Sequence, residues 1–299
     1  KISKEAELKQ GVHRISNDIY HSGPCEIPSL SRGTIVNLLD CPAKAWWNHP
    51  KLNTACPKQE NERKFNLGSA VHDYVLEGGK KIQVIFGYDD WKKKDARELA
   101  DLSFGSGMIP LLEKQFLQVQ AIGEAAKKTI YGCPELGITD LIADGDAELS
   151  YFWDENGTRF RTRLDWISKD KKLILDLKTS NSADPDEFSR KIENFGYCVQ
   201  DSLYRRGVHA VDGTFPELIF IIVETEAPYL CSIVSLSAEF QELGNQKVEA
   251  AIKLWNHCLK TGQWPGYPVH RVAWLEAKPW MISNWESKKY DIEKMIEGY

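Results

Sequence analysis

Residues 158–175 alternate between apolar and polar side chains and then turn apolar, a pattern typical of a two-stranded hairpin. The polar turn at 168–171 is followed by the short apolar run 173–175, which is typical of a buried strand. The alternation predicts that Asp165 lies on the polar face of the first arm. The predicted apolar face carries Phe160, Thr162, Leu164 and Trp166, and the predicted polar face carries Arg159, Arg161, Arg163 and Asp165.

Another strand is expected directly before this hairpin. Residues 147–153 read AELSYFW and are followed by Asn156-Gly157, a strong signal for a tight hairpin turn. Two later apolar runs, 219–223 and 230–234, predict two more buried strands. The chain therefore contains a predicted three-stranded meander followed by a strand pair.

Helical spacing of apolar residues and capping residues predict the other elements. One helix is expected to begin near Ser29 or Ser31 and to be interrupted at Pro42, and another is expected to end at Gly78-Gly79. Further predicted elements are a short strand at 80–88 and helices at 65–77, 91–101, 107–130, 185–193, 237–262 and a segment that bears Gln200 and Tyr204.

The order of these elements predicts an α/β protein with a mixed central sheet flanked by helices. We expect an N-terminal arm at residues 1–19 and a single domain at 20–299, with a helical insertion at about 89–132. Residues 51–64 are expected to form a polar loop near the entrance of the site. The aromatic segment from Trp264 onward is expected to be irregular and to wrap the core or meet another subunit.

Composition narrows the class of protein. No apolar run approaches the ~20 residues of a membrane span, and the first residues lack the apolar core of a secretory signal. The sequence does not begin with Met, so we expect a piece of a longer protein. Seven scattered cysteines without a C-x-x-C pair argue against a disulfide framework, a zinc site or an iron–sulfur cluster. A reducing cytoplasm fits this pattern best.

The net charge of −5 has the wrong sign for a protein that coats nucleic acid. Any affinity for nucleic acid must therefore come from a local lining of basic residues. A nuclease satisfies this condition if its arginines line one channel and its carboxylates gather around a metal.

The hairpin also carries the strongest chemical signal. Asp165 lies in the first arm, and the second arm contains the triplet Asp176-Leu177-Lys178. Two converging carboxylates suit a hard divalent cation, and a neighbouring lysine adds a positive charge that can hold a phosphate or activate water. This combination suits metal-assisted phosphodiester hydrolysis. Taken alone, an Asp-x-Lys triplet at a strand end is more often a solvated edge.

Two further motifs occur in a consistent order around the hairpin. Gly68 and His72 form a G-x-x-x-H pattern upstream, and Gln200 and Tyr204 form a Q-x-x-x-Y pattern downstream. With the hairpin acids and lysine, the set resembles the PD-(D/E)XK nuclease superfamily in its RecB-like branch, and more closely the RecE type, the exonuclease VIII domain of prophage recombination systems. The resemblance runs from about Tyr20 to Tyr267.

The resemblance implies a restriction-endonuclease-like core and a role for each motif residue. His72, Asp165, Asp176 and the backbone carbonyl of Leu177 would bind one or two Mg²⁺ or Mn²⁺ ions, and Lys178 would orient or deprotonate the attacking water. Gln200 and Tyr204 would position the scissile strand. Glu148 is a possible accessory acid outside this motif set. The residues expected to contact DNA phosphates are Arg161, Arg163, Arg205 and Arg206.

The activity implied by the resemblance is processive degradation of linear double-stranded DNA from its 5′ ends. The product would be 3′ single strands for a single-strand annealing protein in DNA recombination, and processivity would require a homo-oligomeric ring. Two alternatives stay open. One is a module of the same fold that grips DNA ends without cutting. The other is an HD-type phosphohydrolase, because His72-Asp73 forms the doublet of that class, although it requires further His and Asp ligands on neighbouring helices.

Overall fold

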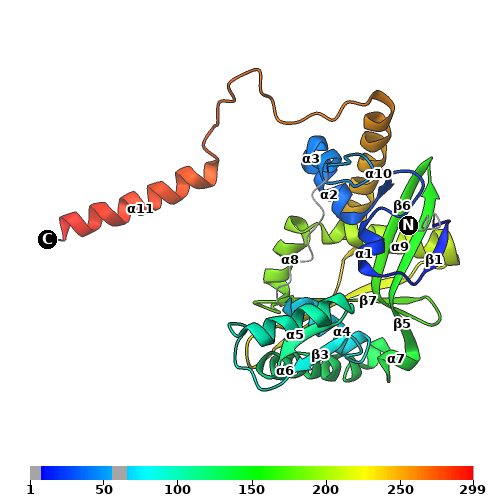
Figure 1. Cartoon of the computed structure of the whole chain (residues 1–299). Coiled ribbons are helices and arrows are strands. Elements are labelled where there is room, and N and C mark those ends of the chain that lie inside the picture. The colour runs from blue at the N-terminus through cyan, green and yellow to red at the C-terminus, as the bar shows by residue number, and fades with distance from the viewer. Residues whose placement is uncertain (1–7, 56–65, 299) are drawn as a thin grey trace. The chain divides into compact units, whose positions relative to one another are not determined.

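The structure is a computed structural model that describes residues 8–55 and 66–298. The chain divides into two compact units, 1–265 and 266–299, which are drawn together in Figure 1. The expected loop at 51–64 lies from residue 56 onward outside the described residues, as do the first seven residues of the expected N-terminal arm.

A mixed seven-stranded sheet forms the centre of the first unit, in the order β1-β5-β6-β7-β8-β9 with β2 paired to β6. β7 and β8 run parallel, as do β2 and β6, and the other neighbours are antiparallel. The predicted α/β class with a mixed sheet is confirmed. The strands are β1 (Gly11–His13), β2 (Ser29–Leu30), β5 (Gly145–Glu155), β6 (Thr158–Ser168), β7 (Leu173–Ser180), β8 (Glu217–Glu224) and β9 (Cys231–Ser235).

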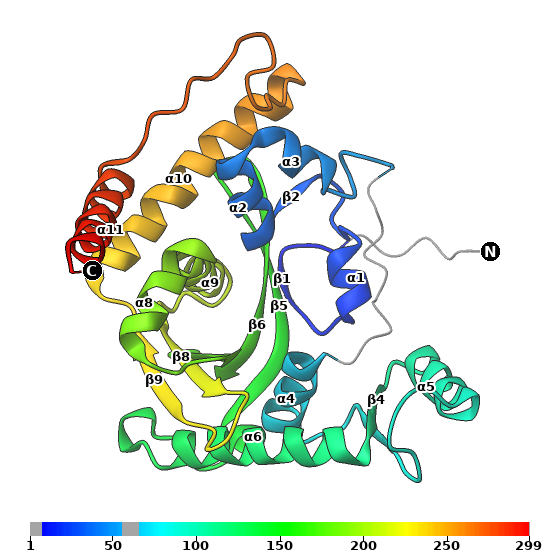
Figure 2. The same cartoon turned by 90° about the vertical axis from the view of Figure 1, so that its left-hand side faces the viewer.

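Helices cover both faces of this sheet, as Figure 2 shows for α9 and α6 on opposite sides. The larger apolar core lies on the α9 side, and a second core lies on the α6 side. Because both faces are covered, the strands in the middle of the sheet are apolar on both sides. The helices on the first side are α2 (Arg32–Asp40), α8 (Pro185–Asn194), α9 (Tyr197–Asp212) and α10 (Ala238–Thr261), and those on the second are α4 (Leu67–Leu76) and α6 (Glu113–Tyr131).

The helix starts follow the capping residues of the sequence. Ser31 accepts a hydrogen bond from the backbone of Thr34 and begins α2, and Pro42 begins the following helix after the extended Cys41. Asn66 caps α4 through the backbone of Ser69. The remaining short elements are α1 (Asn17–His21), α3 (Pro42–Trp47), β3 (Ile82–Ile85), α5 (Lys94–Gly105), β4 (Ile109–Leu112), the 3₁₀ helix η1 (Pro134–Leu136) and α7 (Leu141–Asp144).

Three expectations about secondary structure are wrong. Residues 109–112 form β4, which pairs with β3 in a separate two-stranded parallel sheet, so the helix expected at 107–130 begins only at Glu113. Gly11–His13 is a strand paired with β5, whereas the sequence predicted a loosely held arm. The C-terminal segment was expected to be irregular from Trp264 onward, but a helix begins after Lys278.

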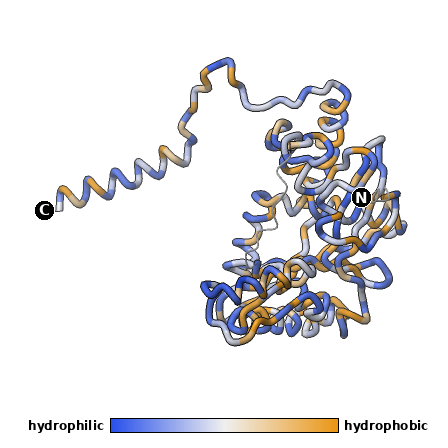
Figure 3. The backbone as a smooth tube through the Cα atoms, viewed as in Figure 1, coloured by the Kyte–Doolittle hydropathy of each residue, from blue (hydrophilic) through white to orange (hydrophobic). Residues whose placement is uncertain are grey.

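The unit 266–299 contains the helix α11 (Pro279–Glu297), which has Pro at its first position and an i, i+4 pair between Lys289 and Glu293. Apolar positions recur along its length, as Figure 3 shows, and none of its residues is buried. The aromatic residues from Trp264 onward favoured an irregular segment in the sequence analysis, so this helix was not expected. Within the described residues, no helix is both long enough and apolar enough to cross a membrane.

Candidate active site

The site begins where β6 and β7 separate. These two strands pair only at Trp166 with Leu175 and at the neighbouring Ile167 with Ile174. The same register places Asp165 opposite Asp176, one step beyond the last pair. In place of a ladder bond, the backbone N–H of Leu177 donates to Asp165 Oδ2 at 3.1 Å. The two acids predicted from the hairpin therefore meet at the opening of the sheet.

β5 and β6 both redirect their side chains at this level. Ala147 and Trp166 pack in the core on the α6 side, whereas Leu149 and Leu164, two residues away in each strand, pack on the α9 side. Flanking pairs place Glu148 opposite Asp165, and Glu148 has a left-handed backbone with φ of 58°. The predicted alternation, which put Leu164 and Trp166 on one face, is wrong at this point because a period of two requires an uninterrupted pleat.

Asp176 is fully buried, and both of its carboxylate oxygens have a partner. Lys178 Nζ forms an ion pair with Oδ1, and Gln200 Nε2 on α9 donates a hydrogen bond to Oδ2. Lys178 also lies 5.1 Å from the centre of the Tyr197 ring. Burial lowers the pKa of Lys178, but the charges of Asp176 and Asp165 outweigh it, so the pKa is raised and the lysine is a cation at neutral pH.

His72 and Glu148 complete the group around Asp165. His72 Nδ1 lies 3.4 Å from Asp165 Oδ2. One ligand atom from each of these three residues lies within 4.8 Å of the other two. Burial and the neighbouring Asp176 raise the pKa of Asp165 to about 6, against the opposing effects of His72 and Lys178. Carboxylates held this closely, with an imidazole beside them, fit a divalent cation.

The position of His72 also bears on the HD-type alternative. That class requires the histidine to meet His and Asp ligands on neighbouring helices. Here the residue that His72 meets is Asp165, on a strand of the central sheet. The doublet His72-Asp73 is therefore not the start of an HD site. Asp73 instead accepts a hydrogen bond from the backbone of Lys81 at 3.0 Å.

Gln200 and Tyr204 lie four residues apart on one helix, α9, as the sequence predicted, and both are buried. Gln200 binds Asp176, so in this structure it holds the acid. Tyr204 faces the adjacent pocket. Burial, followed by the charges of Asp176 and Asp165, raises the pKa of Tyr204 well above its ordinary value, so the hydroxyl stays protonated and can donate a hydrogen bond.

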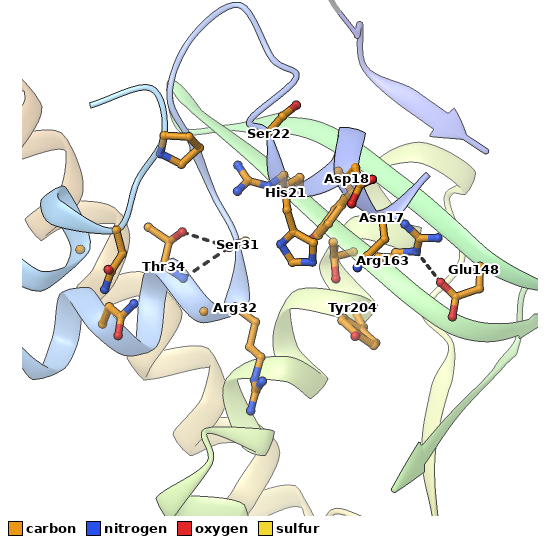
Figure 4. A pocket seen from close by; sticks show the side chains of 18 of the residues that line it. Asn17, Asp18, His21, Ser22, Ser31, Arg32, Thr34, Glu148, Arg163 and Tyr204 are labelled. Carbon is orange, nitrogen blue, oxygen red and sulfur yellow. Dashed lines mark hydrogen bonds and ion pairs between the residues drawn. The ribbon is translucent and has the colours of Figure 1, made fainter. Parts of the chain in front are cut away.

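A pocket of about 1040 Å³ opens beside these residues. Figure 4 shows its polar lining, with Ser31 and Thr34 hydrogen-bonded to each other on one side and Arg163 paired with Glu148 on the other. Asp165, Glu148 and Tyr204 belong to its wall, whereas His72, Asp176 and Lys178 do not. The pocket reaches the candidate cation site through Asp165 and Glu148.

The four arginines predicted to contact DNA occupy different surroundings. Arg161 and Arg163 line the pocket. Arg161 is only 4% exposed, donates to the carbonyl of Ser29 at 3.2 Å and lies over the Tyr20 ring, so it also anchors the strand β2. Arg163 donates from Nε to Glu148 Oε2 at 2.5 Å.

Arg205 and Arg206 lie outside this pocket lining. Arg206 divides its guanidinium between Glu155 at 2.6 Å and Glu249 at 2.7 Å, and Arg205 pairs with the buried Asp201 at 3.6 Å. The position of Arg205 and Arg206 directly after the Q-x-x-x-Y motif does not predict that carboxylates pair with them. We therefore restrict the expected phosphate contacts of the four to those that border the pocket.

Two pocket residues were not among the main expected site residues: Glu148 was expected only as an accessory acid, and Arg32 was not expected. Glu148 follows from the Asn156-Gly157 turn, because counting back across that hairpin places it opposite Asp165. Arg32 is the first residue of α2 and lines the pocket close to the predicted helix start at Ser31. No spacing rule connects Arg32 to the hairpin motifs, since long-range packing alone brings the two together.

Comparison with known proteins identifies one matching family and one solved structure of similar fold. The family described as "PDDEXK-like domain of unknown function (DUF3799)" matches residues 31–271. A crystal structure from Eubacterium rectale, named "Putative exonuclease", superposes with a TM-score of 0.59 at 14% identity, covering 89% of this chain and 97% of that one. The structure of SSO0001 gives a TM-score of 0.27 at 12% identity, covering 68% of this chain and 98% of that one. None of the curated proteins matches.

Proposed function

The chain belongs to the family of PDDEXK-like domains described as DUF3799, and from this premise we propose that it is a metal-dependent exonuclease that degrades linear double-stranded DNA. One observation carries the proposal. The structure gathers Asp165, Asp176, Lys178 and His72, four residues from three separate elements, at the opening between β6 and β7. An acidic pair with a cation and an imidazole is a donor set suited to phosphodiester hydrolysis.

The residues present fit a divalent cation such as Mg²⁺ or Mn²⁺. Asp165 and His72 offer ligand atoms within 4.8 Å of each other and of Glu148, and would hold it. By the motif set, Asp176 and the carbonyl of Leu177 would complete its ligands. When bound, such a cation lowers the pKa of a coordinated water and neutralises charge that develops on the phosphate. A single oxygen-rich set can accept one ion or share its carboxylates between two.

The protein's own side chains act around this site. The charged Lys178, fixed against Asp176 and the Tyr197 ring, orients a water molecule and stabilises negative charge on the phosphate. Because its pKa is raised, the structure favours this orienting role over removal of a proton by Lys178. Gln200 keeps Asp176 in place, and the Tyr204 hydroxyl is available to the substrate in the pocket.

The finer assignment follows the sequence motifs. The ordered set of motifs supports a RecE-type enzyme that removes the 5′-ended strand and leaves 3′ single strands for an annealing protein in prophage recombination. The proposal includes a cytoplasmic location and a homo-oligomeric ring that keeps the enzyme on its substrate. All of the motif acids and the lysine are retained, which supports cleavage over a module that only grips DNA ends.

Digestion of end-labelled duplexes tests the proposal. A linear duplex labelled on either its 5′ or its 3′ end is incubated with the protein and Mg²⁺, with closed circular DNA as the control. We expect rapid release of the 5′ label as mononucleotides, slower loss of the 3′ label and no attack on the circle. Chelation with EDTA and the Asp176→Asn variant should both stop the reaction. Cleavage of the circle at the rate of the linear duplex would contradict an exonuclease.

A further inference from the structure

Glu148 and Arg163 form an ion pair at the junction of the pocket and the cation site. Arg163 Nε lies 2.5 Å from Glu148 Oε2, and the two side chains are 14% and 26% exposed. Both line the pocket, and Figure 4 shows Arg163 directed at Glu148 across its wall. Arg163 Nη1 is buried and has no hydrogen-bond partner. The arginine therefore binds Glu148 through Nε, in the wall of the pocket that a substrate anion would enter.

Glu148 is also within reach of the candidate cation ligands. It lies opposite Asp165 across the β5–β6 ladder and offers an oxygen within 4.8 Å of the ligand atoms of Asp165 and His72. Its left-handed backbone is unfavourable for a residue with a side chain and persists only where the surroundings enforce it. The Glu148 carboxylate thus lies near both the candidate cation ligands and the Arg163 guanidinium.

We propose that Glu148 is a positioning residue that exchanges partners when the substrate enters. A phosphate of the nucleic acid backbone in the pocket competes for the Arg163 guanidinium, because phosphate oxygens match its fork as well as a carboxylate does. Glu148, released from Arg163, turns its charge toward the cation held by Asp165 and His72. Substrate binding and cation binding then strengthen each other. This inference rests on the proposed function, since it requires both ligands.

Reciprocal coupling follows from this exchange. If nucleic acid tightens cation binding, the cation must tighten nucleic acid binding by the same factor, which is commonly about 5- to 150-fold between coupled sites. The free protein, by contrast, has its accessory acid neutralised by Arg163. The cation therefore binds the free protein more weakly than it binds the protein with nucleic acid in the pocket. The complete cation site forms mainly when the substrate is bound.

Calorimetric titration with Ca²⁺ tests this coupling without relying on turnover. The full chain is titrated alone and again with a phosphorothioate duplex that resists cleavage. We expect the duplex to tighten Ca²⁺ binding to the wild-type protein by at least about fivefold. Arg163→Gln should bind Ca²⁺ more tightly than wild type in the absence of duplex, because Glu148 is already free. Glu148→Gln should lose most of this tightening and keep only the part that comes from direct contact between phosphate and cation.

The chain offers a matched control on the same two strands. Arg159 pairs with Asp154 through two hydrogen bonds, of 2.6 Å and 2.8 Å, at the other end of the β5–β6 ladder. Arg159→Gln should keep the coupling of the wild type, and thermal melting checks that each variant is folded. If Arg163→Gln does not fold, Glu148→Gln alone still decides the matter, because it removes the accessory carboxylate while keeping the shape of the side chain.

The outcomes separate this inference from the function on which it rests. Wild-type cleavage with Mg²⁺, together with coupling of wild-type size in Glu148→Gln, would overturn the partner exchange and leave the nuclease assignment intact. Equal loss of coupling in Arg159→Gln and Arg163→Gln would also overturn it, because the effect would then be general electrostatics. Absence of both cleavage and Ca²⁺ binding in the wild-type protein would overturn the proposed function and this inference with it.

Discussion

The carboxylate of Asp165 accepts a hydrogen bond from the backbone N–H of Leu177, at 3.1 Å, where the ladder between β6 and β7 has already ended. A side chain thus continues the link between two strands whose backbones have separated. The opening created in this way exposes Asp165 to the pocket while Asp176 stays buried. One acid can therefore face the substrate while the other is held rigidly behind it.

The first prediction concerns the cation. Crystals soaked in Mn²⁺ should show an anomalous peak within coordination distance of Asp165, Asp176 and His72, because carboxylates and an imidazole that converge at one place form a donor set for a divalent cation. The Asp165→Asn variant should lose the peak. Asp212→Asn, which alters an acid bound to the hydroxyl of Tyr151, serves as the control and should retain it. A peak elsewhere, with none among the three ligands, would contradict the assignment.

The second prediction concerns Lys178. Lys178→Ala should keep cation and DNA binding but cleave about 10²-fold more slowly or worse, the usual effect of removing one positioned donor that stabilises developing charge. The rate is measured in single turnovers on an end-labelled duplex. Lys191→Ala removes a nearby lysine that donates to Ser180 at 2.6 Å, and it should cleave at the wild-type rate. If both variants cleaved at the same rate, a residue other than Lys178 would have to orient the water.

The third prediction separates the arginines by salt dependence. In an Asp176→Asn background, the affinity for duplex should fall steeply with salt, because each phosphate contact releases counterions. Arg163→Gln should reduce the slope of log affinity against log salt by about one unit. Arg206→Gln should leave the slope unchanged, since Glu155 and Glu249 already neutralise that arginine. A reversed ranking would place the DNA path along the other side of α9.

Much of the fold was predictable from the sequence because local signals agreed with the long-range structure. Asn156-Gly157 marked the β5–β6 hairpin, and Ser31 and Pro42 marked the helix boundaries that the structure shows. The motif acids could be paired because a hairpin of known turn places its two arms in register. Asp165 and Asp176 were therefore expected together before their side chains could be seen.

The rest depended on features without a local signature. Glycine is the usual residue where the backbone is left-handed, and position 148 is a glutamate. The sequence therefore contains no sign that the side chains of β5 and β6 change faces at this point. The carboxylate partners of Arg206 come from β5 and α10, which no spacing within α9 could reveal. The strand at 109–112 was too short to outweigh the helical pattern that follows it.

The fourth prediction is a pH dependence of stability at Asp201. Burial raises the pKa of Asp201 to about 6, although Arg205 opposes this effect. The folded protein therefore holds this proton more tightly than the unfolded chain. The contribution to the free energy of unfolding is present below pH ~4 and is lost as pH rises through ~6, up to about 3 kcal/mol at 1.36 kcal/mol per unit.

Urea unfolding of the wild-type protein and Asp201→Asn between pH 4 and 8 measures this contribution. The variant should gain stability relative to the wild type as pH rises from 4 to 6, with a constant difference above pH 7. Asp95→Asn, which changes an exposed acid in the first turn of α5, should follow the wild type throughout. Parallel curves for Asp201→Asn and the wild type would show that the Asp201 pKa is not raised by folding.

The fifth prediction tests the packing of α9 on α10. A Cβ at Gly244 would lie 2.1 Å from the backbone oxygen of Cys198, which cannot move without shifting α9. Gly244→Ala should therefore lower the free energy of unfolding by about 3 kcal/mol or more. Gly33 also lies in a helix, but nothing is within 4 Å of the added atom. Gly33→Ala should change stability by no more than about 1 kcal/mol, with a gain the expected direction.

The pairing of β1 with β5 has a consequence for synthesis on the ribosome. Gly11 pairs with Phe152, a separation of about 140 residues, and β2 pairs with β6 across a similar distance. At roughly 5–20 residues per second, the N-terminal strands wait about 7–28 s for their partners to be translated. During that interval the apolar side chains of Leu30 and Ile35 lack the core that later buries them. Nascent chains stalled before residue 145 should therefore be good clients for chaperones and proteases, whereas chains extended past β9 should resist both.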